Sequence, residues 1–289
     1  MSKILFYLIL KPLSYLPYWV LYGISNFLSF VFYHLIPYRK KVVLANLTNS
    51  FPDKSEEEIK HICKRFYDHL CDLIVESIKL FSITQKQIDA RFKVNNPETL
   101  LPYFEQGKDV IIVGGHYNNW EMLASGIDQQ VAHDTVGLYT KLSNAFFDAK
   151  MKSSRSKFGL RMVTTKDSFA YFKEKHDVPR MTIFGADQSP TYSKSVYWTT
   201  FLSQETAVAL GTERFAKKYD LPVVYGAINK VKRGHYSLDI SILCEQPKET
   251  KEGEITELHT RKLETQIIDQ PEFWLWTHKR WKRQRKENE

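Results

Sequence analysis

The sequence predicts an α/β fold in which a mostly parallel central sheet is flanked by helices and preceded by a hydrophobic, membrane-anchoring helical segment. Three observations predict it. The chain opens with a long apolar stretch, a long amphipathic helix follows, and short strands then alternate with helices. Such alternation is typical of parallel sheets, because each parallel connection needs a crossover. No internal repeat or low-complexity linker divides the 289 residues.

The apolar opening stretch is predicted to contact a membrane. Residues 1–37 contain no Asp or Glu, and the run 13–35 exceeds the roughly 20 residues that span a bilayer core. Pro12 and Pro17 are expected to break it. The basic cluster 39–41 follows at once, which by the positive-inside rule places the next domain in the cytoplasm. We expect an uncleaved anchor or in-plane helices, with a helical hairpin of a soluble domain as the alternative.

The amphipathic helix has a clear start. Ser55 and Glu58 have the spacing of a capping box, in which each side chain bonds the other residue's backbone N–H. Apolar residues then recur at helical spacing from Ile59 to Ile78. The sequence therefore predicts one helix that ends near Phe81 and buries its apolar stripe.

The later elements follow from apolar runs and helical periodicity. Strands are expected at 109–115, 135–142, 181–186, 223–228 and 236–243. Helices are expected at 144–158, 205–219 and 254–268, with a charged loop at 248–253 and a Trp-rich C-terminus. We assign 38–282 to one domain and 283–289 to a basic tail.

Composition narrows the possible functions but does not identify one. The net charge of +8 favours polyanionic partners: nucleic acid, anionic lipid or an acidic carrier protein. The aromatic content of 14% suits either a water–lipid boundary or an aromatic core. Three scattered cysteines without a CxxC pair argue against a zinc site or a disulfide framework, and they fit a reducing compartment.

The strand 109–115 ends at the residues most suited to catalysis. It delivers His116 at its carboxyl end, the edge at which ligands bind in open α/β sheets, after two glycines that permit a tight turn. Glu121 follows five residues later, and we expect its carboxylate to hold one imidazole nitrogen. The other nitrogen would then take a proton from a substrate hydroxyl. A purely structural histidine is the alternative.

The stretch Gly-Gly-His-Tyr-Asn-Asn-Trp-Glu, residues 114–121, closely resembles the His-x4-Glu box of the lipid A biosynthesis late acyltransferases, within the lysophospholipid acyltransferase-like group. Other blocks resemble that family in the same order along the chain. They are Tyr38-Arg39-Lys40-Lys41-Val42-Val43 with Asn46-Leu47 and Phe51-Pro52, then Arg155 with Gly159, Ala186-Asp187-Gln188, and the segment 271–282.

Two blocks depart from the family pattern. The box has Tyr117-Asn118 where the family often has Phe-Gly. After the Asp-Gln block, Thr200-Phe201-Leu202 stands where Phe-Phe-Gly is usual. The second change falls where an acyl or acceptor pocket is expected, so it bears on the substrate rather than on the reaction.

The resemblance implies acyl transfer from a thioester of acyl carrier protein or CoA to a hydroxyl of a membrane lipid, most simply a lipid A precursor. It implies His116 as general base and Glu121 as its partner, with no metal or cofactor, because a thioester is already activated. Backbone amides near Gly115 or the Asp187 loop are candidate donors to the oxyanion.

Three further residues are expected to bind substrate. Arg155 suits a phosphate of the donor or of the lipid headgroup, since guanidinium pairs bidentately with phosphate, and a surface ion pair is its alternative role. Asp187 and Gln188 follow a strand at the same sheet edge as His116. They are expected to position the acceptor or brace the site, with turn capping as the alternative.

The basic C-terminus suits an anionic leaflet or an acidic carrier protein, and a solvated tail is the alternative. No nucleic-acid-binding fold signature accompanies it. We expect the protein at the bacterial inner membrane, with its catalytic domain on the cytoplasmic face.

Three rival functions remain. An acyltransferase of aminolipid, ornithine-type lipid or phospholipid synthesis would use the same site with another acceptor pocket. A hydrolase is disfavoured by the absence of HExxH and GxSxG motifs. A catalytically inactive lipid-binding protein is disfavoured by the intact His116 and Glu121.

Overall fold

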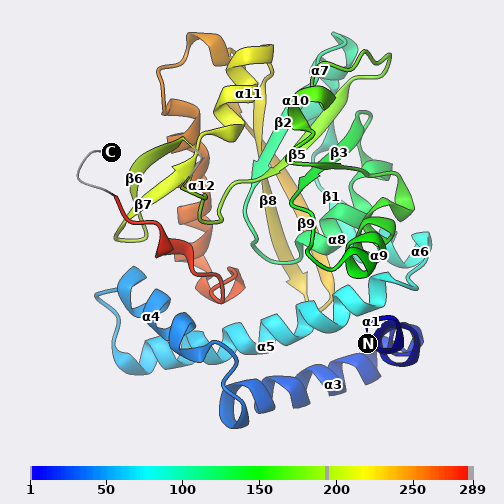
Figure 1. The fold of residues 1–289 in the computed structure, drawn as a ribbon, viewed down its shortest axis with the longest axis vertical. Coiled ribbons are helices and arrows are strands. Elements are labelled where there is room, and N and C mark those ends of the chain that lie inside the picture. Colours follow the sequence, from blue (N-terminus) through cyan, green and yellow to red (C-terminus); the bar gives the residue numbers. More distant parts are fainter. Residues whose placement is uncertain (1, 193–194, 286–289) are drawn as a thin grey trace.

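The computed structural model describes residues 2–192 and 195–285. The strands are β1 (Phe92–Val94), β2 (Val110–Gly114), β3 (Asp134–Tyr139), β4 (Arg161–Thr164), β5 (Arg180–Gly185), β6 (Val196–Phe201), β7 (Gln204–Ala209), β8 (Val223–Lys232) and β9 (His235–Cys244). Seven of them form one sheet in the order β1-β9-β8-β2-β5-β3-β4 (Figure 1). All neighbours are parallel except β8 and β9. The predicted mostly parallel sheet is confirmed.

Helices surround this sheet. They are α1 (Ser2–Leu5), α2 (Lys11–Tyr15), α3 (Tyr18–Phe30), α4 (Lys40–Ser50), α5 (Glu56–Leu80), α6 (Gln85–Asp89), α7 (Leu101–Glu105), α8 (Trp120–Gly126), α9 (Ala145–Arg155), α10 (Ser168–Tyr171), α11 (Gly211–Tyr219) and α12 (Glu254–Asp269). Two π-helical turns, η1 (Phe6–Leu10) and η2 (Val31–Leu35), continue the N-terminal helices. Short 3₁₀ turns lie at Pro97–Leu100, Asp128–Gln130, Ser156–Phe158, Pro247–Glu249, Pro271–Phe273 and Arg280–Lys282.

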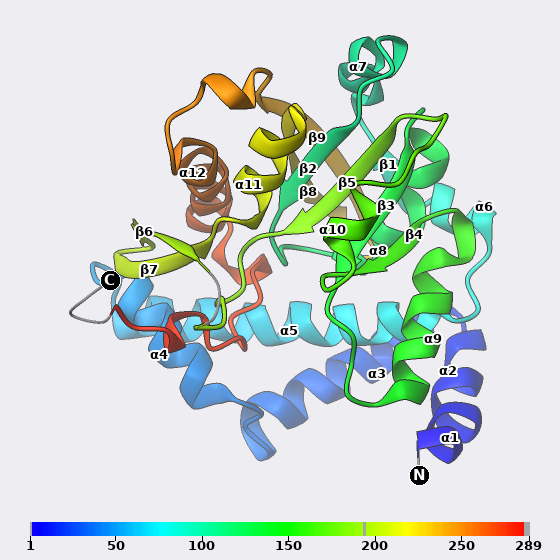
Figure 2. The same ribbon diagram turned by 45° about the horizontal axis from the view of Figure 1, so that its top comes forward.

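The central strand β2 divides the core into two layers. Successive side chains of a strand point to opposite faces, so Ile111 and Val113 pack with α11 and α12, whereas Val110 and Ile112 pack with α8. Figure 2 shows α11 and α12 on one side of the strands and α8 and α9 toward the other. The sheet is therefore covered on both faces, as its uninterrupted apolar strands require.

The long helix α5 begins as predicted. The backbone N–H of Ser55 donates to Glu58 Oε2 over 2.8 Å, and the N–H of Glu58 donates to Ser55 Oγ over 3.3 Å. The helix crosses the molecule beside α3 (Figure 1). Helix α5 contributes to both core layers. Phe66 belongs to the layer with α11 and α12, and Leu80 belongs to the layer with α8.

The N-terminal segment bends at Pro17 but not at Pro12. Pro12 does not break the chain, because Leu10 and Lys11 before it stay helical and the run from Ser2 to Tyr15 continues through it, directly after the π-helical turn η1. Pro17 does end that helix and precedes α3. Among residues 2–192 and 195–285, no single helix combines the length and apolar composition needed to cross a membrane. The stretch Tyr18–Leu35 and the helix Lys40–Ser50 meet that test only as a pair bent by 83°.

The prediction of a helix at 205–219 is wrong for the first part of that range. Residues Gln204–Ala209 form β7, which pairs antiparallel with β6, and only Gly211–Tyr219 is helical. Leu202 and Ser203 connect the two strands with positive φ angles of 50° and 61°. Tight hairpins with this geometry usually carry Gly or Asn, so the sequence contains no turn signal here.

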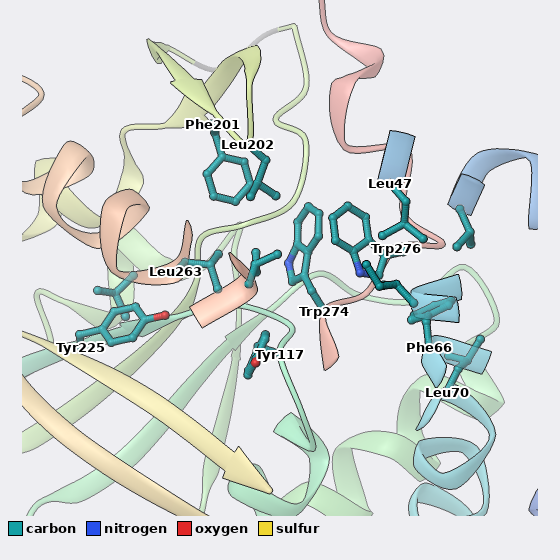
Figure 3. Close-up of a cluster of buried hydrophobic side chains, with 14 of the residues drawn as sticks. Leu47, Phe66, Leu70, Tyr117, Phe201, Leu202, Tyr225, Leu263, Trp274 and Trp276 are labelled. Carbon is teal, nitrogen blue, oxygen red and sulfur yellow. The ribbon is translucent and has the colours of Figure 1, made fainter. Parts of the chain in front are cut away.

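The C-terminal block is part of the core. Trp274 and Trp276 are buried and lie between Phe201 and Leu202 on one side and Leu47 of α4 on the other (Figure 3). The predicted tail begins inside the structure, since Arg283 is buried and donates to the carbonyl of Thr191. Residues 286–289 of that tail lie outside the described residues.

Candidate active site

Two adjacent parallel strands bring His116 and Asp187 to the same edge of the sheet. His116 follows β2 and Asp187 follows β5, and the two strands are paired in register from Val110 and Met181 to Gly114 and Gly185. Carboxyl ends of parallel strands meet at one edge, which is where open α/β sheets bind ligands. The expectation that Asp187 shares the edge of His116 is confirmed.

The side chain of Asp187 holds the imidazole ring of His116. Nδ1 of His116 lies 2.7 Å from Oδ1 of Asp187, and the backbone N–H of His116 donates to Oδ2 over 2.9 Å. The indole N–H of Trp274 also donates to Oδ2, over 2.9 Å. Asp187 is 5% exposed, so these contacts form in a region largely screened from water.

Two glycines make room for this contact. A Cβ atom at Gly115 would lie 2.8 Å from Leu263 and 3.3 Å from the carboxyl carbon of Asp187. A Cβ atom at Gly185 would lie 3.3 Å from Cε1 of His116. Residues without side chains at these positions therefore let the ring and the carboxylate approach each other.

The second imidazole nitrogen faces the open side of the site. Nε2 of His116 lies 3.3 Å from the amide nitrogen of Gln188, which is exposed, and 26% of the His116 side chain is exposed. The ring of Trp120 packs edge-on against the imidazole at 5.1 Å between centroids. Asp187 thus takes the inner nitrogen, and the outer nitrogen remains reachable from solvent.

The two groups change each other's pKa. Burial by itself lowers the pKa of His116, but the charge and hydrogen bond of Asp187, with a smaller contribution from Glu121, raise it above its ordinary value. Burial by itself raises the pKa of Asp187, whereas His116 and the N–H of Trp274 hold it well below its usual range. The pair is therefore poised as a carboxylate beside a more basic imidazole.

Glu121 does not hold the imidazole, and this corrects the expected geometry. Its carboxylate instead accepts two hydrogen bonds from Arg155 of α9, at 2.8 Å from Nε and 2.5 Å from Nη2. Glu121 lies in the first turn of α8, beyond the loop that follows His116, and α9 packs against that helix. A guanidinium is the better partner for a carboxylate because both are planar and charged.

Arg155 lies at the site, but its guanidinium is already paired with the carboxylate of Glu121. Its bidentate contact with Glu121 outweighs the effect of burial and raises the pKa of the guanidinium. Arg155 does form an ion pair, but this pair is largely buried and joins α9 to α8, so it is not the surface ion pair expected as the alternative. Gln188 contacts the ring of His116, and Asp187 braces it.

The loop after His116 is fixed by its own side chains. Asn118 has a φ of 52°, and its amide donates to the carbonyl of Ile228 over 2.9 Å. Asn119 caps α8 by accepting from the N–H of Met122, and it also donates to Glu76 on α5. Gly and Asn are the residues that most readily adopt a left-handed conformation, which explains why Asn118 can stand where the family often has Gly.

Residues that the sequence did not assign to the site also shape it. Trp274 contacts Asp187 from 87 residues away, and the N–H of Ser189 donates to Nε2 of His278 over 3.0 Å. The sequence offered two signals for them: the C-terminus is rich in Trp, and the segment 271–282 resembles a block of the family. Within residues 2–192 and 195–285, no three His, Cys, Asp or Glu side chains are grouped as metal ligands would be.

Residues 2–283 match the family of bacterial lipid A biosynthesis acyltransferases. The chain belongs to this family. It is 22% identical over 271 residues to the lipid A biosynthesis lauroyltransferase of Escherichia coli (strain K12), a match that covers 92% of this chain and 87% of that protein. As a lipid A biosynthesis acyltransferase, the chain is a transferase, and the resemblance drawn from the sequence is confirmed.

Proposed function

We propose that this acyltransferase moves a fatty acyl chain from a thioester of acyl carrier protein or CoA to a hydroxyl of a lipid A precursor, with His116 as general base. The observation that supports this proposal is the contact between Nδ1 of His116 and Asp187, which leaves Nε2 at the open side of the sheet edge. A neutral imidazole held in this way presents a lone pair on Nε2.

The proposed reaction needs one base and an activated donor. Nε2 of His116 takes the proton of the acceptor hydroxyl while the hydroxyl oxygen attacks the thioester carbonyl. Asp187 stabilises the imidazolium that forms. The tetrahedral oxyanion then collapses, the C–S bond breaks, and the imidazolium returns the proton to the thiolate. An ester and a free thiol result. The amide of Gln188 marks the position near Nε2 that the acceptor hydroxyl would take.

Glu121 and Arg155 are proposed to act together. Glu121 engages Nε and Nη2 of the guanidinium, so the Nη1 edge is the part that would meet a phosphate of the donor or the lipid headgroup. The carboxylate keeps the guanidinium oriented and adds negative potential near His116. Glu121 is thus a partner of His116 through the electrostatic field rather than through a hydrogen bond.

The decisive test compares two histidine variants. His116→Ala should reduce transfer from acyl carrier protein thioester or acyl-CoA to lipid A precursor by orders of magnitude while the protein still folds. His61→Ala, on the exposed side of α5, is the matched control and should keep wild-type turnover. Near-wild-type turnover by His116→Ala would refute general-base catalysis by this residue.

The acceptor is tested separately. Mass spectrometry of total lipids from cells with and without the gene should show one acyl chain missing from lipid A. If the missing chain belongs to an aminolipid, an ornithine-type lipid or a phospholipid, the reaction stands and the acceptor assignment is wrong.

We further propose that residues 1–37 attach the catalytic domain 38–282 to the cytoplasmic face of the bacterial inner membrane. Large apolar side chains are exposed along this segment: Ile4, Leu5, Tyr7, Leu8, Ile9, Tyr15, Trp19, Phe27, Phe30, Leu35 and Ile36. The polar side of α3 faces inward, where Ser25 donates to Asp72 and Tyr22 to Glu76. This amphipathic arrangement suits helices that lie in the membrane plane.

Vesicle flotation tests this attachment. Trp19 is 78% exposed on α3, so Trp19→Asp should weaken binding to vesicles that contain anionic lipid. Phe169→Asp changes an exposed aromatic residue on α10 and should bind like the wild type. Equal loss in both variants, or in neither, would contradict attachment through the N-terminal segment.

A further inference from the structure

The carboxylate of Asp187 has two oxygens with different tasks. Oδ1 meets Nδ1 of His116. Oδ2 accepts two N–H donors, the backbone amide of His116 and the indole of Trp274, each over 2.9 Å. The backbone amide belongs to the residue being oriented, so the indole is the donor to Oδ2 that comes from elsewhere in the fold.

Trp274 is itself held firmly. It is 2% exposed and packs edge-on against Phe201 and Trp276, at 5.7 Å and 4.7 Å between ring centroids. Figure 3 shows its indole in the middle of this cluster, with Tyr117 below it. Its backbone forms a bridge with Tyr117, directly after His116. An indole N–H fixed in this way has one direction available to it.

The neighbouring backbone ties the same segment to the catalytic loop a second time. The N–H of Asn118 donates to the carbonyl of Phe273, and the hydroxyl of Tyr117 donates to the carbonyls of Gln266 and Gln270. The segment that carries Trp274 and the loop that carries His116 are therefore joined by several hydrogen bonds. Asp187 follows β5, and its carboxylate contacts both the loop, at His116, and the C-terminal segment, at Trp274.

We propose that Trp274 is a positioning residue whose indole N–H fixes the Asp187 carboxylate with Oδ1 directed at the imidazole of His116. Without that donor the carboxylate can rotate about its Cβ–Cγ bond, and the ring loses its fixed tautomer and orientation. Small displacements of a catalytic base cost up to roughly 10²-fold in rate. The inference rests on the proposed function for its kinetic consequence, but the contact itself is testable without turnover.

Trp274→Phe removes the N–H and keeps an aromatic ring. We expect kcat to fall by roughly 10- to 100-fold while KM stays within about twofold, because substrate contacts are untouched. Trp276→Phe is the matched control: Trp276 is equally buried on the same segment, but its N–H donates to the carbonyl of Pro271. It should leave kcat per folded molecule near the wild-type value.

A spectroscopic measurement separates positioning from mere packing. Proton NMR of the wild type should show a strongly downfield Nδ1–H signal from the bond between His116 and Asp187, absent in His116→Ala. The signal should broaden or disappear in Trp274→Phe and persist in Trp276→Phe. Because no substrate is present, this readout holds even if acyl transfer to lipid A precursors is disproved.

A substitution that keeps the shape of the Trp274 side chain separates loss of the N–H from misfolding. Incorporating 3-benzothienylalanine at position 274 replaces the N–H with sulfur and leaves the ring size almost unchanged. The same loss of the downfield signal is expected. If that signal and kcat both match the wild type in this variant, the indole N–H does not position Asp187.

Discussion

Nδ1 of His116 and Oδ1 of Asp187 lie 2.7 Å apart, although 71 residues separate them in the chain. The contact exists because β2 and β5 are neighbours that end in register at Gly114 and Gly185. It gives the imidazole one defined tautomer, with the proton on Nδ1 and the lone pair on Nε2. A defined tautomer is what general-base catalysis by histidine requires.

Asp187→Asn should test that tautomer. The amide can turn its NH₂ group toward Nδ1 and favour the tautomer with the proton on Nε2, so we expect kcat to fall by about 10²- to 10⁴-fold. Asp177→Asn, on an exposed loop, should have no effect on kcat. Acyl transfer assays on both purified variants check this, and wild-type kcat in Asp187→Asn would exclude the aspartate from catalysis.

The pH dependence should show the raised pKa of His116. The base works only when neutral, so the rate falls as the pH falls through this pKa. Since Asp187 outweighs the opposing effect of burial, the acidic limb of the kcat/KM profile should lie above the ordinary histidine pKa of 6.5. Removing the charge in Asp187→Asn should move the limb to lower pH. A wild-type limb at or below 6.5 would contradict the assignment.

Glu121 and Arg155 should behave as a coupled pair. Glu121→Gln and Arg155→Lys each break the bidentate contact and should lower kcat/KM at least tenfold. The double variant should be little worse than the poorer single variant, with a coupling energy of roughly 1–3 kcal/mol. The exposed pair Arg161 and Glu174 provides the control cycle. Additive losses at Glu121 and Arg155 would mean that they act independently.

Asn118 should tolerate only residues suited to positive φ. Asn118→Gly keeps the turn and loses the hydrogen bond to Ile228, which costs about 1 kcal/mol of stability. Asn118→Val places a β-branched residue in the left-handed region, so we expect a larger loss of stability together with lost activity. Thermal unfolding and transfer assays compare the two variants. Equal stability of both would show that φ does not limit this position.

Glu76 should make stability depend on pH. Burial, with the charge of Asp72, raises the pKa of Glu76 to about 7, despite hydrogen bonds from Tyr236 and Tyr22. The folded state therefore binds this proton more tightly than the unfolded state, whose glutamate pKa is near 4.5. Protonated Glu76 therefore adds roughly 3 kcal/mol to the free energy of unfolding below pH 4.5. This contribution is lost as the pH rises through 7.

Glu76→Gln isolates that contribution. The variant should lose this part of the pH dependence, so its thermal midpoint should fall less than that of the wild type between pH 4.5 and pH 7. Asp89→Asn, on the exposed helix α6, should retain the wild-type profile. Parallel profiles for Glu76→Gln and the wild type would show that Glu76 titrates normally in the folded protein.

The sequence by itself determined the features that depend on near neighbours. A capping box and a 3.6-residue period were enough for α5, and an apolar run before two glycines was enough for β2 and for the place of His116. These signals are local because backbone hydrogen bonds and side-chain faces repeat within a few residues. The strand β7 escaped prediction because its turn at Leu202 and Ser203 contains neither Gly nor Asn.

Only the tertiary structure decided which groups meet. Glu121 is five residues from His116, yet it pairs with Arg155, and the imidazole is held by Asp187 from another strand and, through it, by Trp274 from the C-terminal segment. Strand order and the direction of each side chain set these partners, and neither can be read from spacing along the chain. A charged side chain takes the partner with the best geometry in the fold, however distant in sequence.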